Sequence, residues 1–151
     1  MKLAEALIAR ADYQKRNEQL KRRISLNLKI QEGEEPAEDP NEMLAELDSN
    51  IKELTTLIQR INKTNCSVQF DESRTLADAL VERDQKWDKR LVLAKIAEEA
   101  SIRNDRYSRT EIKIVSTVDV SAIQKQVDQL SKEFRELDTK IQGLNWSIDL
   151  L

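Results

Sequence analysis

Apolar residues recur along this chain at spacings of three and four, the signature of one face of a helix. The pattern predicts long helices over about residues 2–30, 40–62, 76–103 and 121–148. In the second and fourth helices the two spacings alternate, as in a coiled-coil seam. The seam residues that we single out as interaction candidates are Leu44, Leu47, Ile51, Leu54, Ile58 and Ile61 in the second helix, and Leu130, Phe134, Leu137 and Ile141 in the fourth.

The segments between the helices have different characters. Residues 31–39 form an acidic linker, after which Asp39 and Pro40 are placed to cap and open the next helix. Thr75 and Asp78 have the spacing of a capping box. Residues 66–70 and 111–118 alternate apolar and polar positions, so we expect two short strand-like segments there.

Composition supports a mainly α fold. The 151 residues include two glycines and two prolines, and 35% of them are charged. So few turn-forming residues argue against a sandwich or barrel, whereas high charge with periodic leucine and isoleucine favours long helices. We therefore expect a single helical domain over residues 1–151, with four helices in an antiparallel bundle or coiled-coil arrangement. We find no convincing internal sequence repeat.

The same composition excludes several chemistries. The chain has no histidine and one cysteine, Cys66, so histidine-dependent catalysis and the common zinc sites are ruled out. We predict no catalytic residues, no metal site and no cofactor. The net charge of −3 gives no strong signal for nucleic acid. No apolar run is long enough to span a membrane, and the N-terminal residues read as a helix rather than a signal peptide. We expect a cytoplasmic protein.

One cationic segment is a weak candidate for anion contact. Arg103, Arg106, Arg109 and Lys113 lie close together in the sequence, with Tyr107 among them. Such residues contact phosphate in some proteins. Cations at the end of a helix also interact favourably with its exposed carbonyl groups, and this second interpretation is the more economical one.

Several segments together resemble a small bacterial family of helical proteins labelled septicolysin-like. The matching segments are residues 31–40, 60–65, 74–80, 105–112 and 135–138, the last leading to Asn145 and Trp146. The resemblance covers nearly the whole chain. It implies a helical fold and, through the family's label, a pore-forming cytolytic toxin; it supplies no catalytic residues.

These observations lead to one main functional hypothesis. We expect a non-catalytic helical assembly or protein-interaction protein that acts through its heptad seams, as a homo-oligomer or with another protein partner. The first alternative is the toxin that the resemblance implies. The second is phosphate or nucleic-acid binding through the segment from Arg103 to Lys113.

Overall fold

The computed structural model describes residues 1–101 and 113–151, which contain four helices. They are α1 (Leu3–Leu26), α2 (Pro40–Ser67), α3 (Leu76–Ala100) and α4 (Val120–Ser147). The chain is mainly α, as the hydrophobic pattern predicts. It divides into two compact units, one comprising residues 1–69 with 142–151 and the other residues 70–141.

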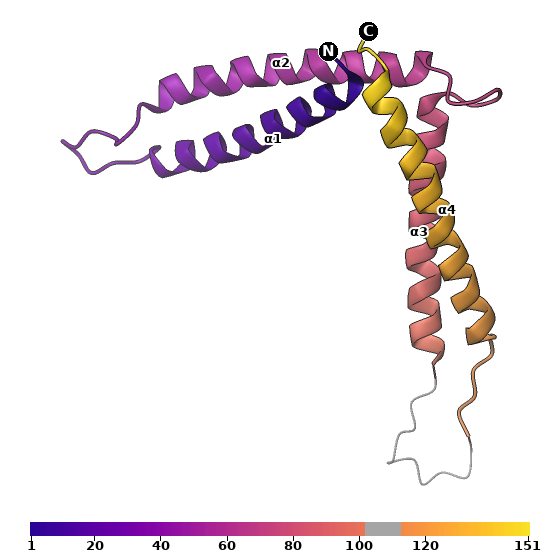
Figure 1. Cartoon of the computed structure of the whole chain (residues 1–151). Helices are drawn as coiled ribbons and strands as arrows, with labels where there is room; N and C mark the ends of the chain where they lie inside the picture. Colours follow the sequence, from indigo (N-terminus) through magenta and orange to yellow (C-terminus); the bar gives the residue numbers. More distant parts are fainter. Residues whose placement is uncertain (102–112) are drawn as a thin grey trace. The chain divides into compact units, whose positions relative to one another are not determined.

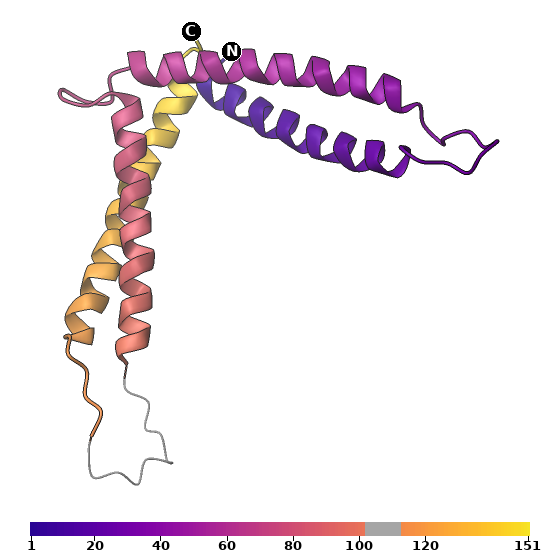
Figure 2. The same cartoon turned by 180° about the vertical axis from the view of Figure 1, so that it is seen from behind.

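In the first unit, α1 and α2 pack as an antiparallel pair (Figures 1 and 2). Near the connecting loop, Leu20 and Ile24 of α1 form a buried cluster with Met43, and Leu47 packs against it. Asp39 accepts a hydrogen bond from the Asn41 amide at 2.8 Å, so the predicted cap of α2 is confirmed. The cap directs the chain from the acidic loop into a helix whose apolar face lies on α1.

The end of the chain belongs to this unit as well. The Leu3 amide donates to the carbonyl oxygen of Ile148 at 2.9 Å, and the Leu150 amide donates to that of Met1 at 2.9 Å. The Leu151 amide donates to Oγ1 of the fully buried Thr64 at 3.0 Å. These bonds hold residues 148–151 against the first residues of α1 and the last turn of α2. Both chain ends therefore meet at one place (Figure 1).

In the second unit, α3 and α4 form an antiparallel pair joined by polar contacts. Arg83 pairs with Asp138 at 2.9 Å, and Lys86 pairs with Glu133 at 2.7 Å. The partner number falls as the α3 number rises, which is the register of antiparallel helices. The Thr75 and Asp78 capping box begins α3 as predicted.

The two hairpins, α1–α2 and α3–α4, are repeats of one another. The structure thus shows a repeat that the sequence analysis does not find. Both α2 and α4 have 28 residues, and Pro40 corresponds to Val120, so equivalent positions are 80 residues apart. Deeply buried residues match in this alignment, because Leu57 and Ile61 correspond to Leu137 and Ile141. The first turns of α1 and α3 also match, with Leu3, Ala4, Ala6, Leu7 and Arg10 recurring as Leu76, Ala77, Ala79, Leu80 and Arg83.

Hydrogen bonds at the ends of the helices follow the same repeat. Asp39 and Asp119 each accept a bond near the start of a helix, from the amides of Asn41 and Ala122. Another corresponding pair joins the Phe70 amide to the Arg74 carbonyl and the Leu150 amide to the Met1 carbonyl, at 2.8 and 2.9 Å. The covalent turn between α2 and α3 thus has a non-covalent counterpart where the chain ends meet.

Several predicted boundaries need correction. Helix α1 ends at Leu26 instead of residue 30, α2 continues to Ser67 instead of residue 62, and α3 ends at Ala100 instead of residue 103. The α2 extension takes Cys66 and Ser67 out of the predicted strand-like segment 66–70, which then continues as a tight turn. Residues 113–118 form no strand, because no segment among the described residues pairs with them, and residues 111–112 lie outside the described residues.

Candidate interaction surface on α2

Helix α2 contacts the rest of its unit through a seam that shares every second position with the predicted one and differs from it by one residue at the others. Its most buried positions are Met43, Leu57, Ile61 and Thr64, which are between 0 and 8% exposed. With the half-buried Leu47, Asn50 and Leu54, they form a continuous series at spacings of three and four. We call this series the inner seam. It faces α1 and, at its C-terminal end, residues 148–151.

The predicted seam shares Leu47, Leu54 and Ile61 with the inner seam, but its other three positions lie beside it. Leu44 is 48% exposed and Ile51 is 47% exposed, and Ile58 is half-buried. We call these three residues, which are seven apart, the outer row. Together the two series form an apolar stripe wider than the seam of a two-helix contact. One of these contacts is made by α1, and Leu44 and Ile51 of the outer row are left about half exposed along the described part of the unit.

The second hairpin is an internal control for this feature. In α4 the positions that correspond to Leu44, Ile51 and Ile58 are Gln124, Ser131 and Asp138. Ser131 Oγ accepts a 2.7 Å bond from Arg90 Nε, and Asp138 pairs with Arg83. The same hairpin fold therefore forms with polar residues at all three positions. Packing within the hairpin does not require apolar residues in the outer row.

The seam of α4, in contrast, is used within the structure. Leu137 and Ile141 are 8% and 0% exposed, and Leu130 and Phe134 are half-buried. The Phe134 ring packs against Trp87 of α3 with their centroids 4.9 Å apart, and the Arg90 guanidinium lies 4.8 Å from the centre of the indole. The predicted seam residues of α4 accordingly offer less free apolar surface than the outer row of α2.

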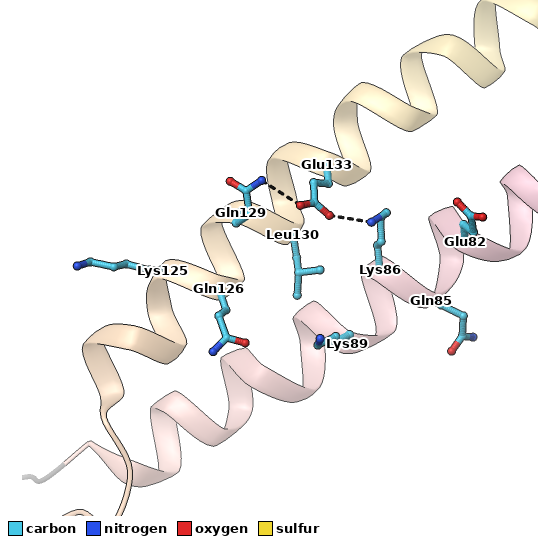
Figure 3. Close-up of a pocket in the computed structure, with 9 residues that line it drawn as sticks. All are labelled: Glu82, Gln85, Lys86, Lys89, Lys125, Gln126, Gln129, Leu130 and Glu133. Carbon is cyan, nitrogen blue, oxygen red and sulfur yellow. Dashed lines mark hydrogen bonds and ion pairs between the residues drawn. The ribbon is translucent and has the colours of Figure 1, made fainter. Parts of the chain in front are cut away.

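A polar groove of about 650 Å³ lies between α3 and α4 (Figure 3). One of the residues that line it is Glu133, which accepts hydrogen bonds from Lys86 at 2.7 Å and from Gln129 at 2.9 Å. The bond from Lys86, followed by that from Gln129, lowers the pKa of Glu133. Stabilising the carboxylate in this way makes it a poor general base near neutral pH. We therefore interpret the groove as part of the polar contact between α3 and α4.

The remaining candidates lie on the surface or outside the described residues. Arg103, Arg106 and Arg109 fall in the undescribed segment, and Lys113 is exposed. Cys66 is a free, exposed thiol near the end of α2. Among the residues described, no group of three or more acidic or cysteine side chains is arranged to hold a metal ion. None of the described helices is both apolar enough and long enough to cross a bilayer.

The fold and this surface define a mainly α protein built from two repeated helical hairpins. The chain belongs to the family of unknown function DUF6847, whose model matches residues 10–150. It is also similar to a protein of known crystal structure, described as a functionally unknown conserved protein from Corynebacterium diphtheriae. The two are 44% identical, the match covers 100% of this chain and 99% of the other, and the TM-score is 0.94. No curated protein matches the chain.

These comparisons overturn the proposed resemblance to septicolysin-like proteins. The matching family is one of unknown function, and the structural relative is likewise functionally unknown. Nothing in either comparison indicates a toxin. Of the segments that suggested the resemblance, residues 31–40 lie mostly in the loop before α2, residues 74–80 begin α3, and residues 60–65 and 135–138 lie within α2 and α4. Residues 105–112 fall outside the described part of the chain.

Sequence reasoning missed the inner seam because two of its members are polar. Asn50 and Thr64 are polar, so the sequence pattern favours the unbroken apolar series that includes Leu44, Ile51 and Ile58. Aligning the sequences of the two hairpins would have revealed the inner seam. The alignment of Leu57 and Ile61 with Leu137 and Ile141 fixes which face of α2 is buried.

Proposed function

We propose that this protein is a non-catalytic interaction protein in which α2 binds a helix of another chain through the outer row. The observation that carries this proposal is the difference between the two hairpins. Leu44 and Ile51 are about half exposed on α2, whereas the corresponding positions on α4 are polar. Apolar residues that the fold does not need are well suited to hold a partner.

The outer row can contribute a measurable part of the free energy of binding. Burying a leucine or isoleucine side chain completely contributes about 1.5–3 kcal/mol. Leu44 and Ile51 are already about half buried, so covering the exposed part of both contributes roughly 1.5–3 kcal/mol. Losing that contribution weakens an association by a factor of roughly 10 to 150. Substitutions in the outer row should therefore have a measurable effect on binding.

The polar chemistry of the second unit supports a non-catalytic role. The carboxylates of the α3–α4 seam at Glu133 and Asp138 are engaged by Lys86 and Arg83. Groups held in ion pairs of this kind position helices and are poorly placed to exchange protons with a substrate. A reducing cytoplasmic setting is part of the proposal and accords with the exposed, unpaired Cys66.

The test exchanges the outer row for the residues that the other hairpin uses. A Leu44→Gln, Ile51→Ser double variant should keep its helix content and melting temperature, since α4 folds with these residues. It should lose self-association, measured by light scattering across a concentration series, and lose capture of any co-purifying protein. Leu26→Gln is the matched control, because Leu26 is 82% exposed at the end of α1 and lies outside the row.

Two results would contradict the proposal. The first is unchanged association of the double variant, which would place binding elsewhere. The second is a large fall in its melting temperature at a concentration where the protein is monomeric, which would show that the outer row serves the hairpin itself.

A further inference from the structure

A second open pocket, of about 390 Å³, lies beside the contact between α3 and α4. Its volume is within the range of sites that bind small molecules. The residues that line it come from both helices at helical spacing, and they are Arg83, Asp84, Trp87, Asp88, Phe134 and Asp138. All of them belong to the second unit. We call this site the aromatic pocket.

Two aromatic rings form the apolar part of the aromatic pocket. The rings of Trp87 and Phe134 have their centroids 4.9 Å apart, and Trp87 is 39% exposed. The guanidinium of Arg90 lies 4.8 Å from the centre of the indole, so this ring already contacts a cation of the protein itself. Arg90 is not among the described residues that line the pocket, and the part of the indole that faces the pocket is therefore open to a second cation. Aromatic rings favour organic cations, whose alkyl groups pack on the ring face.

The polar part of the aromatic pocket is negatively charged. Asp84 and Asp138 both pair with Arg83, at 2.8 and 2.9 Å, so two carboxylates share one guanidinium. Asp88 is exposed, one helical turn further along α3, and forms no ion pair within the described part of the chain. With three carboxylates and one guanidinium, the lining has a formal charge of −2. This charge matches a ligand with two positive groups.

The spacing of the carboxylates sets the length of that ligand. Asp84 and Asp88 are four residues apart on one helix, which is about 6 Å along its axis. Trp87 lies on the turn between them, so an apolar surface separates the two acidic positions. Two ammonium groups joined by four methylenes are also about 6 Å apart when the chain is extended, from standard bond lengths. An aliphatic diamine thus matches the pocket in charge, in length and in its apolar middle.

We propose that the aromatic pocket binds an aliphatic diamine whose two ammonium groups are about four carbon atoms apart. One ammonium group would lie beside Asp88 and the other beside Asp84, with the methylene chain against Trp87. This inference goes beyond the function proposed above, because none of these residues belongs to the outer row.

The first hairpin again provides a comparison. In the same alignment, the positions that correspond to Asp84, Trp87, Asp88, Phe134 and Asp138 are Ala11, Gln14, Lys15, Leu54 and Ile58. These residues include no carboxylate and no aromatic ring, so the repeated hairpin forms without either. The combination of rings and carboxylates is therefore specific to the second hairpin, as expected for residues that serve binding.

An NMR titration of the full chain with 1,4-diaminobutane tests the inference. The indole N–H signal of Trp87 should shift, with a dissociation constant on the order of 1 mM at low salt. The corresponding signal of Trp146, which does not line the pocket, should stay in place. Butylamine, which has the same carbon chain and one ammonium group, is the control ligand. It should bind at least about threefold more weakly, since it lacks one charge contact.

Two substitutions separate the contributions of charge and ring. Asp88→Asn should raise the dissociation constant at least about threefold, and this exposed position should tolerate the change. Trp87→Gln, which introduces the residue of the first hairpin, should raise it by about the same factor, followed through the amide signal of residue 88. Asp128→Asn is the matched control, because it removes the same charge from an exposed position of α4 outside the pocket. It should leave the dissociation constant unchanged.

Several results would overturn the inference. No shift of the Trp87 signal at 20-fold the expected dissociation constant would show that the pocket does not bind the diamine. Equal binding of butylamine would show that a single cation is recognised. Equal competition by Mg²⁺ at constant ionic strength, or no effect of Trp87→Gln, would indicate an acidic ion site that does not use the rings. An equal loss in Asp88→Asn and Asp128→Asn would indicate general attraction between charges.

Discussion

Asn50 is a polar residue within an otherwise mostly apolar seam. Its Nδ2 atom is buried and has no hydrogen-bond partner among the described residues, and the same holds for Oδ1 of Asn17 on α1. In the second hairpin the position that corresponds to Asn50 is Leu130. A buried polar group without a partner lowers stability, because its hydrogen bonds to water are lost on folding. Asn50 thus costs stability that the other hairpin does not lose.

The first prediction follows from this comparison. Asn50→Leu should stabilise the protein by about 1–3 kcal/mol, since it removes a buried donor and adds apolar surface to the seam. Thermal and urea unfolding would measure the change. Asn41→Leu, at an exposed position at the start of α2, provides the comparison and should have little effect. A loss of stability in Asn50→Leu would show that the asparagine is satisfied in the folded protein.

Asp71 controls the turn that leads into α3. It accepts hydrogen bonds from the side chain of Arg74 at 2.8 Å and from the amides of Ser73 and Arg74 at 3.0 and 2.9 Å. The bond from the Arg74 side chain, followed by that from the Ser73 amide, lowers the pKa of Asp71 from 3.8 to about 2. The folded state therefore binds a proton less readily than the unfolded chain does.

The second prediction concerns the pH dependence of this turn. Because the pKa is lowered on folding, the stabilisation from Asp71 is fully present above pH 4 and is lost as the pH falls towards 2. Asp71→Asn should lower the melting temperature at pH 7 and have a much smaller effect near pH 2. Melting curves of both proteins between these pH values would measure this, and a difference independent of pH would contradict it.

At the scale of the elements, α4 contains a glycine with no structural requirement. Gly143 lies within the helix, and no atom would be within 4 Å of a Cβ built at this position. Glycine in a helix interior lowers stability relative to alanine because it has more backbone freedom to lose on folding. The space around it is open, so alanine introduces no clash.

The third prediction is that Gly143→Ala stabilises the protein by about 0.5–1 kcal/mol. Denaturant unfolding monitored by circular dichroism would measure the gain. The other glycine gives the opposite expectation. Gly33 has a φ of +89°, a conformation that alanine rarely adopts, so Gly33→Ala should destabilise its loop. If Gly143→Ala and Gly33→Ala changed the free energy of unfolding in the same direction, this prediction would be contradicted.

At the scale of the whole molecule, the repeat includes the contact between the two ends of the chain. The Leu150 to Met1 hydrogen bond corresponds to the Phe70 to Arg74 bond, and Lys2 and Asp149 are bridged and ion-paired at 2.9 Å. The contact between the ends thus repeats, without a covalent bond, the geometry of the turn that joins the two hairpins.

The fourth prediction is that a circular permutant folds. A short linker would join Leu151 to Met1, and new ends would be opened at the exposed residues Glu72 and Ser73. The permutant should keep its helix content by circular dichroism, since the contacts that replace the broken turn already exist. A permutant with new ends inside α2, between Lys52 and Glu53, should not fold, and serves as the control.

The amino-acid sequence by itself determined the four helices, because apolar periodicity, Asp39 with Pro40, and the Thr75 and Asp78 capping box are local signals. It also determined the absence of histidine chemistry. Which face of α2 is buried depended on tertiary structure, since the series through Leu44 and the series through Met43 are both helical and differ by one residue. Only the packed hairpin shows that α1 covers the series containing Met43 and Leu57. That choice leaves Leu44 and Ile51 exposed, and it makes the surface on which the proposed function rests.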